Sequence, residues 1–132
     1  MIFTLIVHAS PVQHQAPETA LRFAKALLDA GHTLHRVFFY RDGVMNANGL
    51  SSSPPDEPCI PTAWQALAEQ HQLDLVACIA AAIRRGLLDD NEAKRYDKPH
   101  GNLAEGFELS GLGQLTEAAI LSDRVITFGG RG

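Results

Sequence analysis

The sequence predicts a single-domain α/β protein with three α/β/α layers and a mainly parallel sheet of about five strands. Two observations lead to this prediction. Short apolar runs alternate along the chain with segments of helical periodicity, which is typical of a parallel sheet with helices on both faces. The 132 residues suffice for one domain, and 45% hydrophobic with 20% charged residues is a globular composition. The order of the strands does not follow from these observations.

The first half of the chain supplies two strands and two helices. Residues 2–7 form an apolar run typical of a strand that is covered on both faces. A helix is predicted to begin near Pro17, which suits a first turn, and to end at Gly31 as its C-terminal cap. Residues 34–40 predict the second strand, and residues 62–71 predict the second helix.

Residues 41–58 (RDGVMNANGLSSSPPDEP) show neither a helical nor a strand period. A loop of eighteen residues inside a compact domain is usually functional or disordered. The second half of this segment is rich in Ser and Pro, and we expect that half to be the mobile part.

The second half of the chain repeats the alternation with shorter elements. A strand over residues 73–77 ends at Cys78, and a short helix over residues 80–85 stops at Gly86. The Asp-x-x-Glu pattern that begins at Asp89 predicts a capped second short helix, which runs through Arg95. A loop, a strand, a helix and a closing strand follow, over residues 96–106, 107–110, 112–122 and 124–128. We expect the domain to occupy residues 1–128, with residues 129–132 as a short, frayed C-terminal tail.

The composition argues against several classes of function. The net charge of −4 and the pI near 5.8 argue against a nucleic-acid surface, which needs a basic face. No apolar run is long enough to span a bilayer, and residues 1–10 predict a strand rather than a signal peptide. The six histidines lie at unrelated spacings and predict no zinc site, and no dinucleotide or Walker motif is present. Two cysteines imply no disulfide framework and predict a reduced, cytoplasmic setting.

Cys78 is the candidate reactive group, because reactive groups collect at the carboxyl ends of parallel strands. A helix is predicted to start within a residue or two, and its free N–H groups would favour the thiolate, which is the nucleophile. The loops after the first two strands are expected to surround the thiol with polar side chains, from His8, Ser10, His14, Asn46 and Asn48.

Less specific readings compete with this one. A cysteine in an apolar run is, on composition alone, more often a buried structural residue. Cys59, in a Pro-rich segment, is interpreted as an incidental surface thiol. Arg84 and Arg85 lie about two helical turns beyond Cys78, so at least one is expected to face away from it. We expect this pair to shape the local field or to dock a partner.

Three blocks of the sequence, in order, resemble the DsrE/TusD family of small sulfurtransferase subunits and are most similar to its TusD branch. The blocks are FFYRDGVMNAN, LVACIAAAIRRG and FELSGLGQLTEAAILSDRVITF, and the likeness spans residues 2–128. The resemblance implies a DsrE-like fold and a catalytic role for Cys78, which would carry sulfur as a persulfide. This chemistry requires no metal, nucleotide or organic cofactor. Cys59 and the tail match nothing in the family.

The resemblance also implies partners. TusB- and TusC-like subunits are expected to complete a heterohexamer, a TusA-like protein to donate sulfur, and a TusE-like protein to accept it for 2-thiolation of the tRNA wobble uridine. No direct nucleic-acid or membrane contact is expected. Two alternatives stay open: a DsrE-type sulfur-trafficking subunit in dissimilatory sulfur oxidation, and a non-catalytic assembly subunit. In the leading hypothesis, residues 41–58 partly cover Cys78 and move when a partner docks, since exposed persulfides are oxidised.

Overall fold

A five-stranded sheet lies at the centre of the computed structural model, which describes residues 1–129. Residues 130–132, the end of the predicted tail, lie outside the described residues. The strands follow the order β4-β3-β2-β1-β5, and every neighbouring pair is parallel. Their bounds are β1 (Ile2–Val7), β2 (Thr33–Phe39), β3 (Leu75–Cys78), β4 (Phe107–Ser110) and β5 (Arg124–Phe128). The predicted α/β architecture with its parallel sheet is confirmed.

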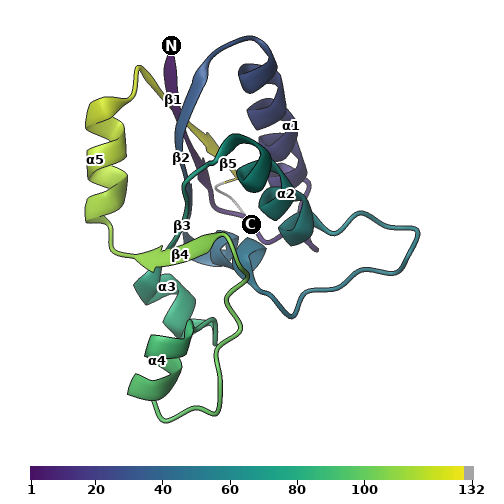
Figure 1. Ribbon diagram of the computed structural model, residues 1–132, viewed down its shortest axis with the longest axis vertical. Coiled ribbons are helices and arrows are strands. Elements are labelled where there is room, and N and C mark those ends of the chain that lie inside the picture. Colours follow the sequence, from purple (N-terminus) through teal and green to yellow (C-terminus); the bar gives the residue numbers. More distant parts are fainter. Residues whose placement is uncertain (130–132) are drawn as a thin grey trace.

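Helices cover both faces of this sheet (Figure 1). The helices α1 (Ala16–Asp29) and α2 (Ile60–His71) lie together on one face, and α5 (Gly113–Leu121) lies on the other. The short helices α3 (Ile79–Arg84) and α4 (Asp90–Arg95) lie at the carboxyl end of the sheet, near β4. The core under α2 is aromatic, since the fully buried Trp64 packs edge-on against Phe39. No helix among residues 1–129 is long and apolar enough to cross a membrane.

The predicted helix ends are present because their local chemistry enforces them. Gly31 adopts a positive φ of 87° after α1, a conformation that glycine tolerates without a steric penalty. The side chain of Asp89 accepts a hydrogen bond of 2.8 Å from the backbone N–H of Glu92 and caps α4.

The prediction of an irregular loop over residues 41–58 is wrong for its first part. Residues Arg41–Ala47 form a 3-10 helix, η1. A 3-10 helix has three residues per turn, so it lacks the 3.6-residue period that identifies an α-helix in a sequence. Four of its residues are buried: Gly43, Val44, Asn46 and Ala47.

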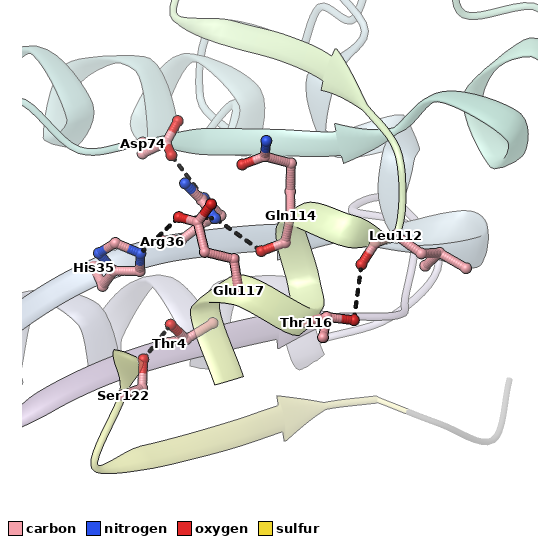
Figure 2. A network of polar contacts seen from close by, with 9 residues as sticks. All are labelled: Thr4, His35, Arg36, Asp74, Leu112, Gln114, Thr116, Glu117 and Ser122. Carbon is pink, nitrogen blue, oxygen red and sulfur yellow. Dashed lines mark hydrogen bonds and ion pairs between the residues drawn. The ribbon is translucent and has the colours of Figure 1, made fainter. Parts of the chain in front are cut away.

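A buried arginine attaches α5 to the sheet (Figure 2). Arg36 of β2 donates from Nε to Asp74 at 2.6 Å and from Nη1 to the carbonyl of Gln114 at 2.8 Å, while Glu117 lies 3.6 Å from Nη1. Ala118 is the one fully buried residue of α5. Glu117, the single charged residue of α5, contacts Arg36 while 52% of its side chain stays exposed, and the other residues of the helix carry no charge.

Candidate functional site

Cys78 lies at the junction of β3 and α3, at the carboxyl end of the sheet. It is the last residue of β3 and pairs with Ser110 of β4, while α3 begins at the next residue, Ile79. Its backbone is extended, with φ −61° and ψ 120°, so the chain turns into the helix directly after the thiol. The prediction that a helix starts within two residues of Cys78 is confirmed.

The thiol of Cys78 is covered by protein. Only 3% of the residue is exposed, and it belongs to the main hydrophobic cluster. No side chain among residues 1–129 donates a hydrogen bond to its sulfur or accepts one from it. The backbone N–H groups in the first turn of α3 donate no hydrogen bond to the sulfur either. A thiol on another protein can therefore reach Cys78 only after neighbouring segments have moved.

The 3-10 helix η1 packs against β3 and α3, the two elements that meet at Cys78. Its backbone rests on the end of β1, because a Cβ atom at Gly43 would overlap the carbonyl oxygen of Val7. The buried side chain of Asn46 donates to the carbonyls of Ala9, at 3.1 Å, and Gly43, at 2.8 Å. The segment that packs against β3 and α3 is thus held in place by specific contacts and is not a loose loop.

Arg85 fastens η1 to α3. Its Nε donates to Asp42 of η1 at 2.8 Å, and its Nη1 donates to the carbonyl of Ala81 at 3.0 Å. Arg84 is exposed, in line with the expectation that at least one of the two arginines faces away from the thiol. No sequence pattern identified Asp42, because it lies forty-three residues from its partner.

The polar residues expected around Cys78 do not form one group. His8 lies beside η1. Its ring packs edge-on against the ring of Tyr40, and the two ring centres are 5.9 Å apart. Burial, and secondarily the positive charge of Arg41, lower the pKa of His8, so its imidazole is neutral at pH 7. Ser10 is partly exposed on the loop after β1.

Asn48 and His14 lie in other surroundings. Asn48 forms an antiparallel bridge with Leu103, and its side-chain oxygen accepts from the backbone N–H of Leu50 at 3.0 Å. His14 lines a cavity of about 320 Å³ together with Cys59 and the Ser-rich half of the predicted loop. Of the five polar side chains expected around Cys78, those of His8 and Asn46 therefore lie at η1, and the other three lie elsewhere.

Cys59 has a more specific setting than an incidental surface thiol. It is the residue before α2 and is partly exposed. The hydrogen bonds that Thr62 donates, first from its hydroxyl at 3.3 Å and then from its backbone, lower the pKa of this thiol. Sequence reasoning missed this activation, although a Thr three residues after a helix-capping Cys is a readable signal.

The reactive groups at this candidate site and at the N-terminus of α2 are the thiols of Cys78 and Cys59. No three His, Cys, Asp or Glu side chains converge in a way that could hold a metal ion within the described range 1–129. Both cysteines are free.

The chain is similar to known proteins along almost its entire length. Residues 1–128 match the DsrE/DsrF-like family. The sulfurtransferase TusD of Cronobacter sakazakii is 50% identical over 128 residues, which cover 97% of this chain and 100% of that protein. DsrE of Allochromatium vinosum is also 50% identical, over 98% of this chain and 99% of that protein.

Solved structures show the same fold at lower identity. The crystal structure of the ychN protein from E. coli matches this chain with a TM-score of 0.73 and 22% sequence identity. The match covers 97% of this chain and 100% of the ychN chain. The match to the DsrE/DsrF-like family extends over all eleven helices and strands found within residues 1–129, and relatives at half identity share almost the whole length. The chain therefore belongs to the DsrE/DsrF-like family.

Proposed function

We propose that this sulfurtransferase carries sulfur as a persulfide on Cys78, between a TusA-like donor and a TusE-like acceptor. The observation that carries the proposal is a free thiol at a strand-to-helix junction of a parallel sheet, next to a segment that can act as a cover. Relatives named sulfurtransferase TusD, about half identical over nearly the full chain, support the reaction class. The activity resides in residues 1–128 as one domain.

The transfer conserves atoms and electron pairs. The thiolate of Cys78 attacks the outer sulfur of the donor persulfide, so that a new S–S bond forms at Cys78 while the donor's S–S bond breaks. The donor cysteine leaves as a thiolate. In the second step the acceptor thiolate attacks the outer sulfur now held on Cys78, and Cys78 leaves as a thiolate. Neither step consumes an oxidant or a reductant.

Access to Cys78 requires η1 to open. Arg41, at the start of η1, has a φ of 52°, a left-handed conformation that costs about 1 kcal/mol or more in a residue with a side chain. A strained residue at the junction of β2 and η1 is a suitable hinge. The closed state shelters a persulfide from oxidation, and the open state exposes it to a partner.

The pathway is thiolation of the tRNA wobble uridine in the cytoplasm, where thiols are kept reduced. Similarity to TusD proteins supports this choice. A DsrE protein is equally similar, at 50% identity, and it favours sulfur trafficking in dissimilatory sulfur oxidation as the second candidate.

The outer face of α5 supports assembly with TusB- and TusC-like subunits. Leu112, Ile120 and Leu121 are 49%, 78% and 51% exposed, and Val125 of the edge strand β5 is 40% exposed. Exposed apolar side chains that lie together in this way are typical of the buried core of subunit interfaces. The heterohexamer is the assembly that would cover this face.

Mass spectrometry of the intact protein tests the proposal. After incubation with glutathione persulfide and removal of the excess, Cys59→Ser should gain one sulfur atom at Cys78, and Cys59→Ser/Cys78→Ser should gain none. A second mixing with an acceptor thiol should remove the added sulfur. If Cys78→Ser still gains sulfur at Cys59 and passes it on, Cys78 is not the carrier. If no variant is loaded, the chain is an assembly subunit.

A further inference from the structure

A groove lies near the end of α3, and its lining residues take no part in the proposed sulfur-transfer step. It has a volume of about 420 Å³ and lies between the end of η1 and the segment after α3. Leu50 and Leu88 contribute apolar surface, and Lys98 and His100 contribute its ionisable side chains. Leu50 is 74% exposed, whereas Leu88 is buried in the wall of the groove.

The walls of the groove are held together by hydrogen bonds. Asn102 accepts from the backbone N–H of Leu88 at 2.9 Å and donates from its own backbone N–H to the Leu88 carbonyl at 2.8 Å. Its carbonyl also accepts from Gly49 at 2.6 Å, which ties the wall to the segment after η1. A Cβ atom at Gly101 would overlap the backbone of Leu88 and Asp89, so the chain passes closely there. A groove with fixed walls costs little to order when a ligand binds.

The segment around the groove is less acidic than the rest of the protein. Residues 84–98 hold five of the eleven Lys and Arg residues and four carboxylates, although the chain has a net charge of −4. Arg85 pairs with Asp42 and Arg95 with Glu92, so the remaining cations of the segment are Arg84, Lys94 and Lys98. Most carboxylates of this segment are engaged internally: Asp89 caps α4, Asp90 accepts from the N–H of Gly101, and Glu92 is buried beside Arg95. Asp97 is the remaining carboxylate, and Lys94 and Lys98 are exposed.

The groove is next to the proposed carrier of sulfur. Gly86 in its wall follows Cys78 by one short helix, which rises by about 1.5 Å per residue, so the two are roughly 10 Å apart along α3. Leu50 follows the last residue of η1 by three positions. A ligand in the groove therefore touches the segments that follow η1 and α3.

We propose that this groove docks the protein that exchanges sulfur with Cys78, through a segment in which a bulky apolar side chain is flanked by carboxylates. The apolar side chain packs on Leu50 and Leu88, and the carboxylates pair with Lys98 and accept a hydrogen bond from the imidazole of His100. This inference rests on the proposed function, because it supplies the partner for that reaction. Binding there holds the partner within reach of Cys78 and acts on the two segments that cover it.

A peptide titration monitored by NMR tests the docking. The probe is the capped peptide Glu-Asp-Leu-Asp-Glu, and the control peptide has Lys at all four acidic positions. The acidic peptide should shift the amide signals of Gly86, Leu88, Gly101 and Asn102 at millimolar concentration or below, and less so at high salt. The doubly substituted protein Leu50→Ser/Lys98→Glu should bind at least tenfold more weakly, as should Lys98→Glu alone to a smaller extent. Lys25→Glu, which makes the same charge change on the exposed face of α1, should bind as the wild type does.

Two outcomes would overturn the docking site. One is equal binding of the acidic and basic peptides, and the other is the absence of shifts at these four residues. Loading of each variant with glutathione persulfide is measured in parallel, because that small donor does not need the groove. Normal loading without peptide binding refutes the docking site alone, whereas peptide binding without loading refutes the sulfur-carrier role of Cys78.

Discussion

Cys59 and Cys78 both directly precede a helix, yet the protein treats them differently. Cys78 is buried before a helix of six residues, whereas Cys59 is partly exposed before a helix of twelve. Thr62 donates a hydrogen bond to the sulfur of Cys59. Cys59 is thus the more accessible thiol, and Cys78, at the carboxyl end of a central strand, is the less accessible one. Chemical labelling can distinguish the two cysteines.

Alkylation of Cys59 should have a lowered pH midpoint. The hydrogen bonds from Thr62 stabilise the thiolate, so the pKa is lowered and the reactive form is present at a lower pH than in an unperturbed thiol. In a Cys78→Ser background, the iodoacetamide rate of Cys59 should reach half of its plateau at a lower pH than that of a free cysteine. Thr62→Val should raise the midpoint, and Thr62→Ser should keep it. A midpoint that Thr62→Val leaves unchanged would contradict this reading.

At the scale of elements, two arginines each hold one segment in place. Arg85 fastens η1 to α3 through Asp42, and Arg36 fastens α5 to the sheet through Asp74 and the carbonyl of Gln114. The first contact is largely exposed and the second is largely buried. We therefore expect η1 to open easily and α5 to stay attached.

Breaking the first contact should expose Cys78. An exposed ion pair contributes about 0.2–1 kcal/mol, so Asp42→Asn should raise the alkylation rate of Cys78 by up to about fivefold. Iodoacetamide labelling in a Cys59→Ser background measures this rate. Glu18→Gln, which breaks the exposed pair of Glu18 with Arg22 on α1, is the matched control and should have no effect. If both variants behave as the wild type does, η1 is not the cover that limits access.

Breaking the second contact should cost stability. Arg36→Ala leaves Asp74 and the Gln114 carbonyl without their donor and removes a buried side chain, so we expect a loss of about 2 kcal/mol in the free energy of unfolding. Urea denaturation measures the loss. Arg22→Ala, which removes an exposed pair, should stay within about 0.5 kcal/mol of the wild type. Equal stability of the two variants would show that the Arg36 contacts are not what attaches α5.

The elements were predictable from sequence where a local pattern determines them. Pro17, Gly31 and Asp89 mark helix ends through backbone chemistry that acts within a few residues, and these ends are where the patterns placed them. The strand order and the Asp42–Arg85 contact join distant residues and leave no local pattern. The position of Cys78 at a strand end was predictable, but the 3-10 helix that packs against β3 and α3 was not, because it has no α-helical period.

At the scale of the whole molecule, polarity is unevenly distributed. The end of the sheet near α3 and α4 is rich in cations, while the outer face of α5 and the neighbouring part of β5 carry exposed Ile120, Leu121 and Val125. The two surfaces suit different partners: a charged protein that docks transiently near Cys78, and an apolar subunit surface that binds permanently.

A charge on the outer face of α5 should prevent assembly without affecting the fold. Ile120 is 78% exposed, so Ile120→Glu should change the free energy of unfolding by no more than about 0.5 kcal/mol. The variant should no longer co-elute with co-expressed TusB- and TusC-like subunits in size-exclusion chromatography. Val12→Glu, at a 95% exposed apolar residue on the loop after β1, should still co-elute. Normal co-elution of Ile120→Glu would place the subunit interface elsewhere.

Gly43 packs directly against the Val7 carbonyl, so few other residues would be accepted at this position in a saturation library of the whole chain. Any side chain there would push η1 off the strand end while most of the core stayed intact. In such a library, variants that still express well but have lost sulfur transfer should therefore be concentrated at this glycine. Substitutions at Gly43 would therefore separate a loss of sulfur transfer from misfolding, while Cys78 itself stays unchanged.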